Sequence, residues 1–115
     1  MSMVKLMVLI KKKHDLSQEE FSSYWKDVHG PLVIRSIPGM RRYVQNHVLK
    51  MPGSESNFDG VLEIWYDDME SYKASTDFFS SEDGKVVSED GAKFMDNSKS
   101  AFLLVEEKVD EKIIT

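Results

Sequence analysis

The sequence predicts an α+β domain in which strands and helices follow the order strand, helix, strand, strand, helix, strand. Three observations lead to this fold class: the spacing of apolar residues, the signals that begin helices, and the length of 115 residues, which fits one domain. Four segments have the length and the apolar content of strands. They cover residues 4–11, 40–49, 60–67 and 100–110.

The first helix is predicted to begin at Ser17 and to end at His29. Ser17 is a favourable N-cap, and Glu20 three residues later completes a capping box. Apolar and aromatic residues then recur at helical spacing, which indicates one buried face. These residues are Phe21, Tyr24, Trp25 and Val28. The Gly-Pro pair after His29 predicts the end of this helix, and Pro31 would open a second short helical segment over residues 31–36.

The two middle strands follow one another, and further helices come after the second of them. In the strand at 40–49, Tyr43, Gln45 and His47 alternate with their neighbours and share one face. Aspartate at the end of the following strand predicts a helix capped by Asp67. A later helix is predicted to begin at Ser81 and to extend to Phe94.

An element order of this kind folds most simply as a ferredoxin-like sandwich, in which helices cover one face of a four-stranded antiparallel sheet. The strands at 4–11 and 100–110 are apolar on both of their alternating faces. Large exposed apolar surfaces are rare on monomers, so the uncovered face predicts a second copy of the chain. We therefore expect a single domain, residues 1–115, that forms a homodimeric α+β barrel.

Composition excludes several classes of partner. The net charge is −5, and the only basic run is Lys11-Lys12-Lys13, which argues against nucleic-acid binding. The apolar start of the chain is too short to span a membrane, and its positive charges follow the apolar run rather than precede it. The chain has no cysteine, which removes disulfides and thiolate metal sites and suits the cytoplasm, where we expect the protein.

Three stretches carry a resemblance to a known family. "FSSYWKDVHGPLV" is followed by "IPGMRRYVQNHV" and later by "DGVLEIWYDD". Together they resemble the EthD family of dimeric α+β-barrel proteins over essentially the whole chain. That resemblance implies the ferredoxin-like fold and a homodimer, and members are often described as oxidoreductases. A more distant resemblance to methylmuconolactone methylisomerase implies an acid–base histidine at His29 and a pocket tyrosine at Tyr43.

His29 and Tyr43 are the candidate catalytic residues. An imidazole titrates near neutral pH, so His29 could transfer protons, and apolar neighbours and the helix end would shift its pKa in opposite directions. Otherwise His29 would simply hydrogen-bond the last carbonyls of its helix. Tyr43 would either hold a substrate oxygen or fill the core that faces the helices. In the functional interpretation both side chains line one cleft between helices and sheet.

The candidate substrate-binding residues are aromatic or basic: Tyr24, Trp25, Trp65 and His47. Binding pockets are usually apolar with a few polar groups, so these rings could line a pocket for a planar apolar ligand. The alternative places most of them in the core and His47 in solvent near its strand end. Of Arg41 and Arg42, at most one can face the cleft, because neighbours on a strand point to opposite faces.

No cofactor is expected. His14, His29 and His47 are the only histidines and lack metal-binding spacing, and no glycine-rich phosphate loop is present. Haem ligation by His29 or His47 is a weaker alternative. The predicted function is acid–base chemistry on a small hydrophobic, aromatic or lactone compound, by isomerisation, cyclisation or cofactor-independent oxidation. The alternative is a non-catalytic dimeric protein that binds a hydrophobic metabolite, which turnover would distinguish.

Overall fold

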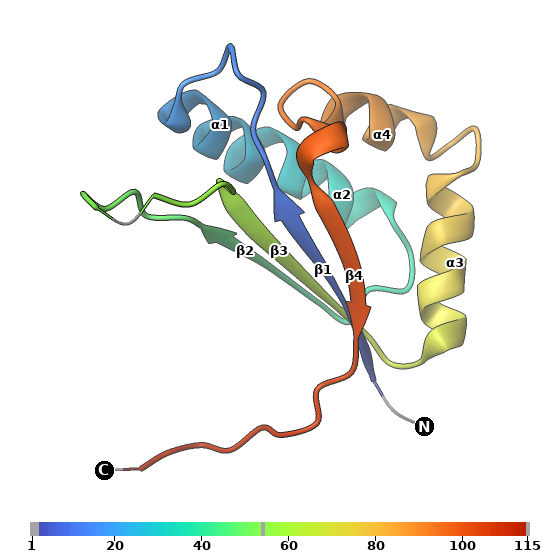
Figure 1. The fold of residues 1–115 in the computed structure, drawn as a ribbon. Coiled ribbons are helices and arrows are strands. Elements are labelled where there is room, and N and C mark those ends of the chain that lie inside the picture. Colours follow the sequence, from blue (N-terminus) through green and yellow to red (C-terminus); the bar gives the residue numbers. More distant parts are fainter. Residues whose placement is uncertain (1–2, 54, 115) are drawn as a thin grey trace.

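The computed structural model describes residues 3–53 and 55–114 and has the predicted α+β architecture (Figure 1). Its strands are β1 (Val4–Ile10), β2 (Arg42–His47), β3 (Gly60–Tyr66) and β4 (Ala101–Val105). Its α-helices are α1 (Gln18–Tyr24), α2 (Gly30–Ser36), α3 (Met69–Phe79) and α4 (Lys85–Gly91). A π-helix, η1 (Trp25–His29), joins α1 to α2, and a short 3₁₀ helix, η2 (Asn97–Lys99), precedes β4.

The four strands form one antiparallel sheet in the order β2-β3-β1-β4, which is the ferredoxin-like topology. The helices lie together on one face of this sheet (Figure 1). On β1, Val8 and Ile10 pack with aromatic residues of the helix layer. Because side chains alternate along a strand, Met7 and Leu9 belong to the opposite face. The prediction of a helix-covered antiparallel sheet is confirmed.

Burial of two aromatic rings holds α1 and η1 on the sheet. Phe21 and Trp25 have no exposed surface and pack with Phe94 and the β1 side chains in one cluster. Trp25 lies directly against Gly60 at the start of β3. A Cβ atom at Gly60 would approach the indole ring to 2.5 Å, so the missing side chain lets helix and strand come into close contact.

The start of the first helix is as predicted, and its end is not. Ser17 and Glu20 form the capping box, with both reciprocal hydrogen bonds present. The chain does not leave the helix at Gly30, whose φ of −56° and ψ of −53° are helical. It continues through η1 into α2, with Pro31 in the first turn of α2. Proline lacks an N–H group and clashes with the carbonyl four residues earlier, and the wider π turn accommodates it without ending the helix.

The later helices begin at other residues than those predicted. Asp68, not Asp67, caps α3, and its carboxylate accepts a hydrogen bond from the Ser71 amide. Helix α4 begins after Gly84, because Ser81 instead closes a turn by accepting a hydrogen bond from the Gly84 amide. Strand β4 is shorter than predicted, and residues 106–114 run as an extended segment away from the body of the domain (Figure 1).

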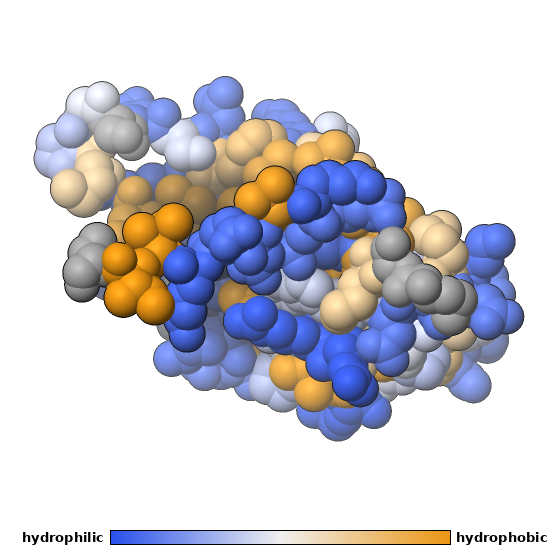
Figure 2. Space-filling model, turned by 90° about the horizontal axis from the view of Figure 1, so that it is seen from below, coloured by the Kyte–Doolittle hydropathy of each residue, from blue (hydrophilic) through white to orange (hydrophobic). Residues whose placement is uncertain are grey.

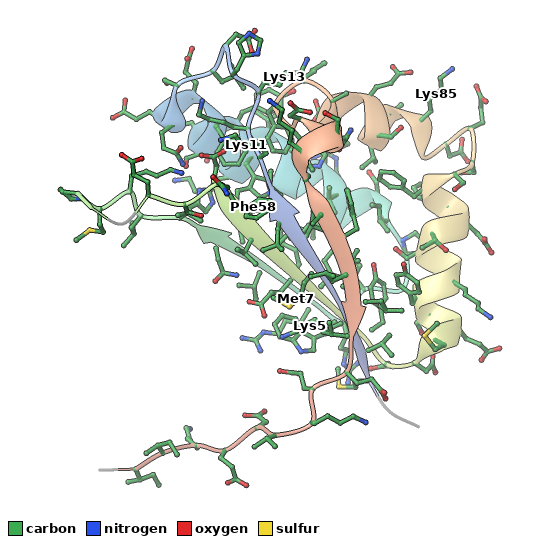
Figure 3. All side chains as sticks on the ribbon, in the orientation of Figure 1. Lys5, Met7, Lys11, Lys13, Phe58 and Lys85 are labelled. Carbon is green, nitrogen blue, oxygen red and sulfur yellow. The ribbon has the colours of Figure 1, made fainter. Side chains whose placement is uncertain are left out.

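The sheet face opposite the helices combines apolar and charged side chains. Seen from below, the molecule shows apolar patches separated by hydrophilic surface (Figure 2). Lys5 and Met7 lie next to each other on this part of the sheet (Figure 3). Lys5 donates to Glu63 at 2.9 Å and lies 3.5 Å from Glu107. Within residues 3–53 and 55–114, no helix has the length and apolar character needed to cross a membrane.

Replacement of Trp25 by alanine is expected to lower the free energy of unfolding by about 3–5 kcal/mol, because a completely buried ring is lost and a cavity remains. Urea denaturation measures this loss. Val28→Ala is the matched control, since Val28 lies in the same π-helix and is 46% exposed. That control should stay within about 0.5 kcal/mol of the parent protein. A loss below about 1 kcal/mol for Trp25→Ala would contradict the packing described here.

Candidate functional site

A cavity of about 500 Å³ lies between the helix layer and the sheet. Strands β1 and β3 supply its apolar floor through Leu6, Val8, Leu62 and Ile64. Helix α3 lines another part of it with Tyr72, Ser75, Thr76 and Phe79. The volume is within the range of small-molecule sites, which are mostly apolar and contain a few polar groups. This cavity is therefore the candidate site.

His29 lies in the lining of this cavity and is 9% exposed. Its ring packs against Phe94, with the ring centroids 4.8 Å apart, and it is close to Gly91 of α4. Nδ1 lies 2.9 Å from Oδ2 of Asp90. Nε2 makes no hydrogen bond to any residue that the structure describes. The ring thus has one nitrogen fixed by a carboxylate and one available to the cavity.

Asp90 is a candidate site residue that sequence reasoning missed. The residue is 7% exposed, and its carboxylate binds two groups: one oxygen accepts a hydrogen bond from the Tyr24 phenol, and the other contacts His29. Lys93 lies at the edge of this group, with its Nζ 3.8 Å from Oδ1 of Asp90. A sequence signal did exist. Val87, Asp90 and Phe94 stand at helical spacing, so Asp90 is a charged residue on the buried side of its helix.

These contacts determine the protonation states of His29, Asp90 and Tyr24. Burial lowers the pKa of His29, and the opposing effect of Asp90 does not cancel it. Burial alone would raise the pKa of Asp90, but the hydrogen bonds from Tyr24 and His29 and the charge of Lys93 outweigh burial and lower it. The hydrogen bond to Asp90 raises the pKa of Tyr24 to about 12. At pH 7, His29 is therefore neutral and donates through Nδ1 to an ionised Asp90, which leaves the Nε2 lone pair free.

This environment differs from the one expected for His29. The helix continues past the residue, so the imidazole is not at a helix C-terminus, and the dipole argument for a charged ring does not apply. A neighbouring carboxylate favours the charged form instead. The alternative in which His29 only caps the last carbonyls of its helix is wrong for the same reason.

Tyr43 is not among the residues that line this cavity, whereas His29 is. Its hydroxyl accepts a hydrogen bond from Gln45 at 3.0 Å. Its ring packs with the buried cluster of Val4, Ile64 and Tyr66. Tyr43 therefore fills the core that faces the helices, which is the second of the two alternatives predicted for it.

The predicted substrate-binding residues are also outside the cavity lining. Tyr24 acts on the site indirectly, through Asp90. Trp25 is fully buried in the core. His47 is not free in solvent: its ring lies 4.5 Å from the Trp25 ring, and its nitrogens contact Ser22 and Gln45.

Trp65 belongs to the opposite face of the sheet. Its indole N–H donates to Glu107 at 2.8 Å, and Arg42 lies over its ring at 4.6 Å. Arg41 lies 3.6 Å from Asp67. Neither arginine lines the cavity. Among the described residues, no group of three or more histidine and carboxylate side chains could hold a metal ion.

Comparison with known proteins agrees with this architecture. A solved structure of an EthD family protein from Bacillus halodurans has a TM-score of 0.70 and 30% identity, and the match covers 91% of this chain and 98% of that one. A hydroxynitrile lyase from Passiflora edulis has a TM-score of 0.67 and 14% identity, with 98% of each chain covered.

A dimeric protein of unknown function from Bacteroides fragilis, with a ferredoxin-like fold, has a TM-score of 0.63 and 18% identity, over 91% of this chain and 96% of that one. Among curated proteins, no match was found. The family match is direct: the EthD domain matches residues 13–98. The chain belongs to the EthD domain family.

Proposed function

We propose that this protein is an enzyme that transfers protons on a small, uncharged, largely apolar molecule bound in the cavity. The observation that carries this proposal is the buried pair of His29 and Asp90, with the free Nε2 of the imidazole at an apolar cavity. A general base needs a neutral form at the working pH and a fixed orientation. Both conditions are met by the burial of His29 and by its hydrogen bond to Asp90.

In this mechanism, Nε2 of His29 accepts a proton from a carbon or hydroxyl group of the substrate. The ring becomes positively charged, and the Asp90 carboxylate stabilises it through the Nδ1–H bond, as carboxylates do in other histidine-based sites. Tyr24 holds the second carboxylate oxygen and stays protonated because of its high pKa. The same imidazole can then return the proton to another atom, which completes an isomerisation, a cyclisation or an elimination.

The charge of the lining supports an uncharged substrate. None of the described side chains that line the cavity belongs to lysine, arginine, aspartate or glutamate. A charged group moved from water into such a site would lose hydration without gaining a partner. A lactone, ketone or phenol fits this lining, with its apolar body on the β1 and β3 residues. The hydroxynitrile lyase among the similar structures is an enzyme with the same fold, and that likeness concerns the fold alone.

We also propose a homodimer that is formed through the sheet face opposite the helices. Met7 and Leu9 on β1 lie beside Val61, Leu103 and Ala101 on the neighbouring strands, by the pairing register. Leu103 is 46% exposed. A second copy would cover this apolar strip, and the similar protein from Bacteroides fragilis is dimeric.

The catalytic proposal is tested with His29→Gln and Asp90→Asn on a panel of uncharged lactones, ketones and phenols. For a substrate that the parent protein converts, each variant should lose about 10²–10⁴ in turnover, the usual contribution of general acid–base catalysis. His14→Gln is the matched control, since His14 is exposed and lies outside the cavity lining. Full activity of His29→Gln would refute the proposal. Saturable binding of panel compounds without turnover would identify a binding protein instead.

Turnover should vary with pH in the same way as the fraction of His29 that is neutral. Because burial lowers the pKa of His29, the fraction of active base rises as the pH increases, and it passes its midpoint below pH 6.5, the ordinary value for histidine. Two-dimensional ¹H–¹⁵N NMR of the ring nitrogens measures this pKa directly. In Asp90→Asn the pKa should fall further, because the negative charge that opposes burial is gone. An increase in Asp90→Asn would contradict the assigned contact.

Sedimentation at low micromolar concentration should show a dimer. Leu103→Glu would place a charge in the proposed apolar interface and should raise the dimer dissociation constant at least about tenfold, which corresponds to 1.4 kcal/mol. Val86→Glu is the control, because Val86 is 63% exposed on α4, in the helix layer. Equal dissociation constants for the two variants would place the interface elsewhere.

A further inference from the structure

We propose that Gln45 is a positioning residue that holds the π turn of η1, and that this turn brings Tyr24 and His29 to the same carboxylate. The inference rests on the proposed function, because it assigns a role in preparing the His29–Asp90 pair. Gln45 itself does not line the cavity and would not touch substrate.

Tyr24 and His29 are five residues apart and both bind Asp90. In a regular α-helix, with 3.6 residues per turn, residues five apart point about 140° away from each other. Their side chains would then reach different neighbours. In a π turn the repeat is i to i+5, so the two residues stack along one side of the helix. The convergence on Asp90 therefore requires the π geometry of Trp25–His29.

Gln45 acts on the carbonyl that closes this turn. The Trp25 carbonyl accepts the i to i+5 bond from the Gly30 amide, and it accepts a second hydrogen bond from Nε2 of Gln45 at 2.9 Å. The other proton of Nε2 goes to the Tyr43 hydroxyl at 3.0 Å, and Oε1 lies 2.8 Å from Nε2 of His47. Every polar atom of the amide has a partner. The helix carbonyl is thus anchored to strand β2 at one fixed position.

Gly30 provides the space that this contact needs. A Cβ atom at position 30 would lie 2.4 Å from Nε2 of Gln45, far inside normal contact distance. Gly30 has ordinary helical dihedral angles, so its backbone does not require glycine. Glycine is needed at this position because the Gln45 amide approaches so closely. π turns are rare and are frequently found at functional sites, which agrees with a set of hydrogen bonds that holds one in place here.

The test is the tautomer of His29, read from long-range ¹H–¹⁵N spectra of the parent protein and of Gln45→Met. Methionine keeps the length of the side chain and removes the donor. The parent should show the Nδ1–H tautomer bonded to Asp90. Gln45→Met should show a mixture of tautomers, and turnover of any substrate found should fall at least about tenfold. Asn46→Leu is the control: it replaces the next amide on β2, whose side chain bonds Val61 and Glu63 instead.

A second variant keeps the proposal open to refutation if Gln45→Met does not fold. Gln45→Asn retains an amide that is one methylene too short to reach the Trp25 carbonyl, and it should change the His29 tautomer in the same direction. An unchanged His29 spectrum in either folded variant would overturn the proposal. The spectrum needs no substrate, so an altered tautomer would support the role of Gln45 even if His29→Gln proved that the protein is not an enzyme.

Discussion

The shared carboxylate of Asp90 is the interaction on which the helix layer and the candidate site both depend. A buried carboxylate is costly unless it is hydrogen-bonded, and here one donor comes from the end of α1 and the other from η1. The contact therefore fixes α4 against the first helical segment. It also fixes the proton of the imidazole on Nδ1. One interaction contributes to the packing of the fold and sets the chemical state of His29, so the two cannot be varied independently.

Much of the fold could be predicted from the sequence because its signals are local. The Ser17–Glu20 capping box involves only neighbouring residues, and the alternation around Tyr43, Gln45 and His47 is a property of one strand. The order of strands and helices predicted a sheet with helices on one face, and the two-sided apolar character of the first strand predicted a second copy of the chain on the other face. The error at the start of α3 is a choice between the adjacent capping groups Asp67 and Asp68. At α4 the predicted cap, Ser81, closes a turn instead, and the helix begins after Gly84.

The candidate site was less predictable because it depends on contacts between distant segments. His29 was recognisable as a histidine in an aromatic helix, but its partner Asp90 is 61 residues away. The Gly-Pro pair favours a helix end by local rules, whereas the space at Gly30 is limited by Gln45 and the Trp25 carbonyl, which local rules do not include. The resemblance assigns Tyr43 to a pocket and residue type assigns Trp65, but their surroundings follow from strand register and helix placement, which no single segment specifies.

Under the proposed function, the residues that react and the residues that select a ligand stand on different elements around the cavity. The pair proposed to transfer protons stands on η1 and α4, whereas a large part of the wall, including Tyr72, Thr76 and Phe79, stands on α3. Changes along that one helix can reshape the volume and polarity available to a ligand while the imidazole and its carboxylate keep their geometry. Such a division allows a lineage to acquire new ligands through few mutations, and proteins with one reactive group can diverge widely in what they accept.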